Sequence, residues 1–276
     1  MEAQYTLSTF TPSEAEAITG LSTTMQRDWR RREFLPRGDG HARFDAFALA
    51  QMMVMKALAD RGIGPQQTVK IAEWAAGGLC WEAMGWKDAF EGDFEQTYDW
   101  LPEDQRPSRE PSADVLKVLS HLNDEARAEA DLHGMDGSWG AKSQFLRKQV
   151  LRLKGIPRVI PARFLVWWAN GDHCFTVDLG RAFDSVSSGD ERVAGPAIVL
   201  DLNALASNLI DRTGRPLVHV EYPTNDQGEI QPPIEYGAPV AFSPAVLTDE
   251  RRAEAEAILA HTQAILAANK NKAPAQ

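Results

Sequence analysis

The amino-acid sequence has little cysteine and no long hydrophobic run. Only Cys80 and Cys174 occur in its 276 residues. They are far apart and match no metal-ligand spacing, so we expect reduced thiols rather than a disulfide or a metal site. No stretch of eighteen apolar residues is present, which argues against a transmembrane helix. The first residues include the acidic Glu2 and no apolar segment, so we expect no secretory signal. These absences predict a cytoplasmic protein with no membrane partner.

Short motifs of common enzymes are also missing. The sequence contains no G-x-S-x-G, phosphate-binding loop, G-x-G-x-x-G or H-E-x-x-H. One run, Asp172-His173-Cys174, combines residue types of a thiol catalyst, but neighbours along a strand point to opposite faces and do not converge. We therefore predict that the chain is not an enzyme and uses no cofactor or metal. Other polar residues are interpreted as turn, buried or edge side chains: Asp178, Asp184, Asp201 and His219.

Acidic residues outnumber basic ones, and the two signs are segregated along the chain. The net charge of −10, with a pI near 5.1, would repel DNA from the protein as a whole. Residues 22–43, however, hold six arginines against three acids. Residues 80–136 hold fifteen acids against five bases, and residues 137–171 hold seven bases and no acid. This uneven balance leaves DNA binding open for the N-terminal segment.

The N-terminal segment begins with signals for two short helices joined by a turn. Thr11 can cap the first helix, and Glu14 completes a capping box with it. Gly20 then supplies a turn, and Ser22 or Thr23 can cap a second helix. This pattern predicts a helix-turn-helix.

Arginine is concentrated in the second helix and in the loop that follows it. Guanidinium groups bind phosphates and the edges of guanine, so the second helix has the composition of a recognition helix. The loop over residues 35–44 is punctuated by proline and glycine and fits a wing. The arginines are Arg27, Arg30, Arg31 and Arg32 in the helix and Arg37 and Arg43 in the loop.

Residues 10–74 resemble the N-terminal DNA-binding domain of MerR-type regulators and the related excisionase-like winged helices. Glu33 stands where that family has a glycine, and Asp28 replaces an aromatic residue. The match covers about a quarter of the chain. It rests on Thr19-Gly20-Leu21-Ser22, Arg27 with Trp29, Phe34-Leu35-Pro36, Ala42-Arg43-Phe44, and a second helical pair at 52–58 and 65–75.

The resemblance implies how this segment would bind double-stranded DNA. Arg27 would face the major groove, and Arg43 would anchor the wing to the phosphate backbone. Trp29, Phe34 and Phe44 are expected to pack inside the small domain. The predicted DNA contacts are Thr23, Thr24, Gln26, Arg27, Arg30, Arg31, Arg37, His41 and Arg43.

Residues 79–160 are expected to form a helical middle segment, acidic and then basic. Gly77-Gly78 should end the preceding helix. Residues 83–110 are either an irregular acidic connector whose aromatic side chains dock on a neighbouring domain or a surface for a protein such as RNA polymerase. A helix is predicted from 111 to about 132. The basic run 141–154 predicts an amphipathic helix that either contacts DNA or packs against the connector.

Residues 161–247 predict a small α+β domain with one helix at 203–211. Trp167, Trp168 and Phe175 would either bind an apolar effector or fill its core. The final segment, 248–276, predicts a helix that covers the sheet or pairs with a second protomer. The expected strands are 164–169, 174–179, 197–201 and 216–222.

These patterns predict an α+β fold, with a winged helix-turn-helix over residues 1–78. At 276 residues and 43% apolar content, the chain can hold two cores. The predicted function is a sequence-specific transcriptional regulator that binds DNA as a homodimer. Gly85, Gly92 and Pro102 exclude the long dimerisation helix usual in the family. Two alternatives stay open: an excisionase-like factor that bends DNA in a phage or mobile element, and a protein-interaction module that contacts RNA polymerase or another partner.

Overall fold

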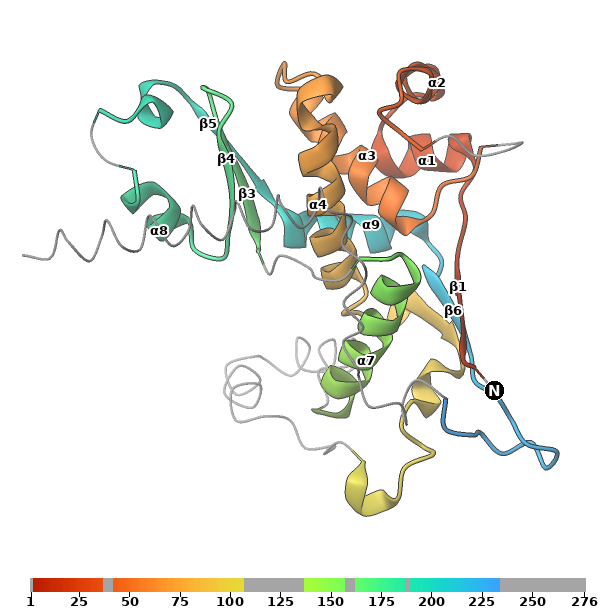
Figure 1. Cartoon of the computed structure of the whole chain (residues 1–276). Helices are drawn as coiled ribbons and strands as arrows, with labels where there is room; N and C mark the ends of the chain where they lie inside the picture. The colour runs from red at the N-terminus through yellow and green to blue at the C-terminus, as the bar shows by residue number, and fades with distance from the viewer. Residues whose placement is uncertain (1, 37–41, 107–136, 157–161, 187–188, 234–276) are drawn as a thin grey trace, which may run out of the picture. The chain divides into compact units, whose positions relative to one another are not determined.

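The computed structural model describes residues 2–36, 42–106, 137–156, 162–186 and 189–233 (Figure 1). Helices and short strands follow one another along these residues, so the class is α+β, as predicted. Contacts group residues 1–233 into one unit and residues 234–276 into a second, which lies outside the described residues. The helices predicted at 111–132 and within 248–276 also lie outside the described residues.

The first two helices begin and end where the sequence predicts. Helix α1 (Pro12–Thr19) follows Thr11, whose backbone N–H donates to the Glu14 carboxylate at 2.6 Å while its hydroxyl accepts from the Glu14 N–H. Gly20 ends the helix in the left-handed conformation, with φ of 73°. The hydroxyl of Ser22 then accepts a hydrogen bond from the Met25 N–H and caps α2 (Thr23–Arg31). Both capped helices are therefore confirmed.

The second helical pair is longer than expected. It comprises α3 (Ala46–Ala59), capped by Asp45, and α4 (Pro65–Ala83). The prediction that Gly77-Gly78 ends this pair is wrong, because α4 continues through both glycines, which are buried. A Cβ built on Gly77 would lie 3.9 Å from the Ile156 side chain, so the glycine faces a neighbouring segment instead of solvent. Packing against the rest of the chain offsets the low helix propensity of glycine.

The acidic connector is held by its aromatic side chains. Its described residues form three short 3-10 helices, η1 (Lys87–Ala89), η2 (Asp93–Gln96) and η3 (Glu103–Gln105), and strand β2 (Phe90–Gly92). Helix α7 (Gly137–Leu153) contains the predicted basic helix. Phe90 and Phe94 lie 5.9 Å from the Trp139 ring of α7, and Trp100 lies 5.0 Å from Tyr222. These contacts agree with the first interpretation of the connector, in which its aromatic residues dock on neighbouring elements.

One of the two sheets in the described residues is local in sequence. Strand β3 (Phe164–Trp168) lies between β4 (His173–Thr176) and β5 (Ala197–Asp201), and both pairings are antiparallel. A short helix, α8 (Leu179–Asp184), and the 3-10 helix η4 (Glu191–Ala194) connect β4 to β5. Trp167 and Trp168 are almost fully buried, in agreement with the interpretation that they fill the core.

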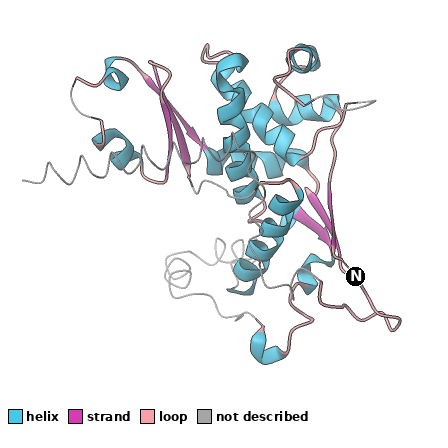
Figure 2. Cartoon of the chain, viewed as in Figure 1, coloured by secondary structure: helices cyan, strands magenta, loops and turns pink. Residues whose placement is uncertain are grey.

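The other sheet joins three distant parts of the chain. Strand β6 (Val218–Glu221) pairs antiparallel with β1 (Gln4–Leu7) and parallel with β2 (Figure 2). The strand predicted at 216–222 is thus present, but we expected it beside the other C-terminal strands, and it belongs instead to a sheet with residues from the N-terminus and the connector. The structure adds β1 and β2, which the sequence analysis did not predict.

Helix α9 (Leu202–Thr213) ties the C-terminal part to the N-terminal helices. It packs against α4, α1 and α3, and its buried Leu202, Ala206 and Leu209 belong to the same hydrophobic core as the first four helices. The expected boundaries at residues 78 and 160 therefore do not divide this unit.

Candidate nucleic-acid interface

A buried glutamine fixes the turn between α1 and α2. The amide of Gln26 donates hydrogen bonds to the carbonyls of Pro12, at 3.0 Å, and Leu21, at 2.8 Å. Gln26 and Leu21 are both fully buried. The Thr19 hydroxyl donates to Ala15 and accepts from the Leu21 N–H. Gln26 therefore fixes α2 from its buried side. The prediction that Gln26 contacts DNA is wrong, because its side chain points into the protein.

The outer face of α2 carries the remaining residues predicted there. Thr24, Arg27 and Arg31 are exposed and follow the i, i+3, i+7 spacing of one helix face, while Thr23 is half-buried. Trp29, on the opposite side, is buried, as predicted. The Arg27 side chain forms no hydrogen bond or ion pair with any residue that the structure describes. Its guanidinium is thus available to a ligand at the centre of this face.

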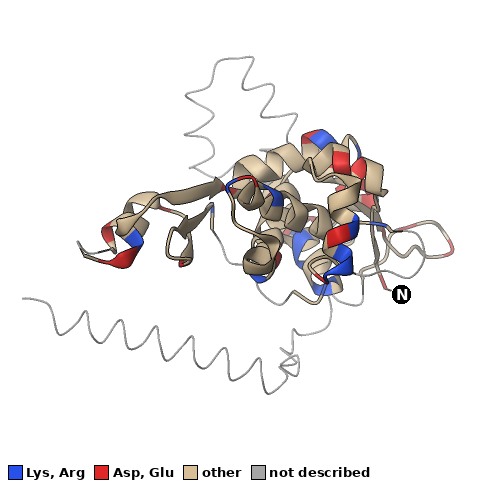
Figure 3. Ribbon diagram, turned by 90° about the horizontal axis from the view of Figure 1, so that it is seen from above, with Lys and Arg blue, Asp and Glu red and all other residues tan. Residues whose placement is uncertain are grey.

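The other arginines of α2 interact with the protein itself. Asp28 binds Arg31 at 2.6 Å and Arg32 at 3.0 Å, and the guanidinium of Arg30 lies 5.9 Å from the centre of the Phe44 ring. Figure 3 shows basic and acidic residues close together on the helical part of the molecule. Exposed ion pairs of this kind stabilise little, so a phosphate can compete for Arg31 and Arg32 at small cost.

The base of the predicted wing is anchored beside α1. Phe44 pairs with Phe10 through two backbone hydrogen bonds of 2.8 and 2.9 Å, and both rings are buried. Arg43 is exposed and has no hydrogen-bond or ion-pair partner among the described residues. The tip of the wing, with Arg37 and His41, lies outside the described residues.

The basic helix α7 ends near this base. The Lys154 ammonium, just beyond α7, binds the Asp45 carboxylate at 2.7 Å. Arg147 instead lies over the Trp81 ring at 4.8 Å, and Lys142 donates to the carbonyl of Glu95. The exposed Lys148 remains without a partner among the described residues. Part of the charge of α7 therefore packs on the protein, as in the second of the two roles we had left open, and a DNA contact of this helix stays a prediction.

Three residues near this face were missed or underrated by the sequence analysis. Glu33, which departs from the family pattern, has a left-handed backbone with φ of 66°, the conformation that explains a glycine preference at this position. Met25 is exposed on α2. Arg212 of α9 donates to the carbonyl of Ile18, at the end of α1, at 3.0 Å. Of these, only Glu33 had a local signal, its departure from the family's glycine. The Arg212 contact joins residues almost two hundred positions apart, so no local pattern could indicate it.

Several of the polar residues considered for catalysis hold local structure. Asp178 and Asp201 cap α8 and α9, and Asp201 also binds Arg163 at 2.9 Å. His173 stacks on Trp167, and its partial burial lowers its pKa. Burial raises the pKa of the Cys80 thiol well above its usual range. Among the described residues, no three histidine, cysteine or acidic side chains gather in a metal-binding group.

Comparison with known proteins adds no relative. The chain matches no protein-family model and shows no significant similarity to a curated protein. Within the described residues, no helix combines the length and apolar character that crossing a bilayer requires. The resemblance of residues 10–74 to MerR-type domains therefore rests on their motifs alone.

Proposed function

We propose that the protein is a sequence-specific DNA-binding regulator of transcription whose N-terminal part works as a MerR-like winged helix-turn-helix. The observation that carries this proposal is the exposed Arg27 side chain, which has no hydrogen-bond or ion-pair partner among the described residues. Arg27 lies at the centre of the exposed face of α2, and no described residue binds its side chain. On the buried side of the same helix, the hydrogen bonds of Gln26 hold α2 in place. An exposed arginine without an ion-pair partner, on a helix held in place by buried hydrogen bonds, is suited to bidentate recognition of guanine in the major groove.

Arg43 is assigned the complementary role of backbone anchor. It lies in the predicted wing loop, directly before Phe44, whose pairing with Phe10 fixes the position of this end of the loop. Phosphate contacts position a protein on DNA without reading the sequence. We expect the regulator to act as a homodimer on an inverted repeat and to distort promoter DNA, as the family resemblance implies.

The test is selection of bound fragments from sheared host DNA by the purified protein, followed by affinity measurements on the enriched site. Arg27→Ala should cost about 1–3 kcal/mol and relax base preference. Arg43→Ala should weaken all sequences alike and reduce the dependence of affinity on salt. Arg181→Ala, which removes an exposed arginine of α8, is the matched control and should change neither. Unchanged binding by both Arg27→Ala and Arg43→Ala would refute the assignment of this face.

The ion pairs of Asp28 support a second candidate, a protein-binding face on α2. Asp28 compensates charge on Arg31 and Arg32, and Met25 beside it is exposed. A mixed face with an apolar residue is suited to a protein partner. Absence of DNA binding at every salt concentration, together with capture of purified RNA polymerase that Arg27→Ala abolishes, would favour this candidate.

A further inference from the structure

Two arginines, one in the last turn of α9 and one just beyond it, contact both ends of α1. Arg212 donates to the carbonyl of Ile18, in the last turn of α1, at 3.0 Å. Arg215 donates to the carbonyl of Thr9, just before α1 begins, at 2.8 Å. Its guanidinium also lies 4.4 Å from the centre of the Phe10 ring. We refer to Arg212 and Arg215 as the arginine clamp.

Helices α1 and α2 are joined to each other by hydrogen bonds of their own. The amide of Gln26 on α2 donates to the carbonyl of Pro12, at the start of α1, and to that of Leu21 in the turn. The backbone N–H of Thr23, the first residue of α2, donates to the Glu16 carboxylate of α1 at 2.9 Å. A displacement of α1 is therefore passed on to α2 and to its exposed face.

The other end of α1 adjoins the base of the predicted wing. Phe10 pairs with Phe44 through two backbone hydrogen bonds, and Arg43 directly precedes Phe44 in the wing loop. Arg215 contacts the Phe10 ring and lies 3.2 Å from the Glu14 carboxylate. The two members of the clamp thus act on different parts, one on the end of α1 that leads into α2 and the other on the end beside the wing.

Building on the proposed function, we propose that the arginine clamp positions α2 and the base of the wing for base-specific DNA recognition without itself contacting DNA. A bidentate hydrogen bond to a base edge forms only within a narrow range of distances and angles, so it depends on how the helix is held. Phosphate contacts position a protein on any sequence. The clamp should therefore act on base preference through α2 and on general affinity through the wing.

The clamp acts on a helix that is held in the fold by other contacts as well. Ala15 and Ile18 of α1 are buried in the hydrophobic core, whereas both arginines are exposed. Arg212→Met and Arg215→Met keep a long apolar side chain and remove only the guanidinium. Both variants should therefore retain the far-ultraviolet circular dichroism of the wild type and lose only the restraint on the ends of α1.

Amide hydrogen exchange of the full chain tests the clamp without DNA. Arg212→Met removes the donor to the Ile18 carbonyl and should speed exchange of the Gly20 and Leu21 N–H groups by about tenfold. Arg212→Lys can still donate one hydrogen bond and should restore part of the protection. Exchange in strand β3 should not change. Arg181→Met, which alters an exposed arginine of α8, is the control and should leave exchange at Gly20 as in the wild type.

Affinity for the enriched DNA site and for unrelated DNA tests the positioning role. Arg212→Met should weaken binding to the enriched site by about tenfold and to unrelated DNA by at most about twofold. Because Arg212 is assigned no phosphate, the dependence of affinity on salt should stay as in the wild type. In protein that already carries Arg27→Ala, Arg212→Met should not change base preference further, because the contact that it positions is absent.

The wing side is tested by Arg215→Met. This variant should weaken binding to both DNAs alike, by about threefold, and should have no further effect in Arg43→Ala protein. Arg181→Met should change neither affinity.

The outcomes separate the clamp from the proposed function. A wild-type protein that enriches no DNA site would refute the proposed function and with it the positioning role. If the wild type binds a site through Arg27 but Arg212→Met and Arg215→Met bind it equally well, the function stands and the clamp is refuted. Equal losses of Arg212→Met on the enriched site and on unrelated DNA, or unchanged exchange at Gly20, would also overturn the clamp.

Discussion

The two sheets in the described residues are assembled in opposite ways. Sheet β4-β3-β5 takes all its strands from residues 164–201, whereas sheet β1-β6-β2 joins residues 4–7, 90–92 and 218–221. The first can form from neighbouring chain segments. The second requires the chain to close over two hundred residues, and its formation holds the N-terminal helices and α9 in one unit. Its integrity therefore bears on the candidate nucleic-acid interface, although none of its strands carries a predicted contact.

The largest difference between the sheets is expected when a methyl group is added at a glycine of each. A Cβ on Gly92, with φ of +82°, would lie 2.3 Å from the Val220 carbonyl oxygen of the adjacent strand. The backbone of β6 must then shift, so Gly92→Ala should destabilise the protein by about 3 kcal/mol or more. Denaturation in urea measures this loss as a lower midpoint.

Gly171→Ala is the matched substitution in the β3–β4 hairpin. Gly171 also has a positive φ, +92°, but a Cβ there meets no atom within 4 Å. Only the backbone conformation is penalised, and the loss should be about 1 kcal/mol. Equal losses for the two variants would contradict the view that close packing against β6 makes Gly92 special.

A smaller difference is expected from buried hydrogen bonding beside β6. The Thr97 hydroxyl lies 2.6 Å from the Phe94 carbonyl and 2.8 Å from the Tyr222 hydroxyl. Because the hydrogen of Thr97 goes to the carbonyl, Tyr222 is the donor in the second bond. Tyr222→Phe leaves Thr97 buried with an unused acceptor and should cost about 1 kcal/mol.

Alkaline pH should remove this difference. Burial raises the pKa of Tyr222 to about 12 from its usual value of 10.0. A raised pKa favours the neutral phenol in the folded state, so its contribution is complete below pH 10 and is lost as the pH rises toward 12. Unfolding of the wild type and Tyr222→Phe between pH 8 and 12 measures this. Thr176→Val in β4 affects a more exposed hydroxyl and should cost about 0.5 kcal/mol, with no corresponding change above pH 10.

Local signals explain which parts of the fold could be predicted. The α1 capping box, the Ser22 cap and the pairing of β3 with β4 depend on residues within a few positions of one another, and they are present as expected, although β4 ends at Thr176, before the end of the predicted strand. The pairing of β1 with β6 depends on residues about two hundred positions apart, and no local pattern specifies such a partner. Gly77-Gly78 shows the same limit, since a local helix-ending signal is overridden by packing.

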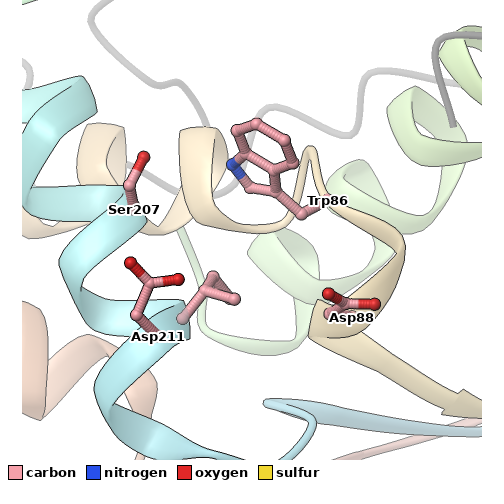
Figure 4. Close-up of a pocket in the computed structure, with 5 residues that line it drawn as sticks. Trp86, Asp88, Ser207 and Asp211 are labelled. Atoms are coloured by element: carbon pink, nitrogen blue, oxygen red, sulfur yellow. The ribbon is translucent and has the colours of Figure 1, made fainter. Parts of the chain in front are cut away.

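The candidate interface divides along the same line. The exposed position of Arg27 and the buried one of Trp29 follow from helical periodicity. The burial of Gln26 could not be predicted in this way. A glutamine near the start of such a helix can hydrogen-bond to DNA or to backbone carbonyls, here those of Pro12 and Leu21, and its identity does not distinguish the two. A small surface pocket is lined by side chains from residues 86–88 and 207–211 (Figure 4), and no local sequence pattern indicates it because the two segments are far apart in the chain.

The smallest expected effect concerns the ion pair between Glu14 of α1 and Arg215, which precedes β6. The Thr11 backbone and hydroxyl, and then the charge of Arg215, lower the pKa of Glu14 from 4.5, and Arg215 lies 3.2 Å from the carboxylate. A lowered pKa means that the ionised form stabilises the fold. This contribution is complete above the unfolded value near 4.5 and is lost as the pH falls through the folded pKa. The stability difference between the wild type and Glu14→Gln should therefore shrink from pH 6 to pH 3.

Glu73→Gln, which changes an exposed glutamate of α4 with no hydrogen-bond partner among the described residues, provides the control. A difference that stays constant over this range would show that Glu14 acts through its size and hydrogen bonding, independently of its charge.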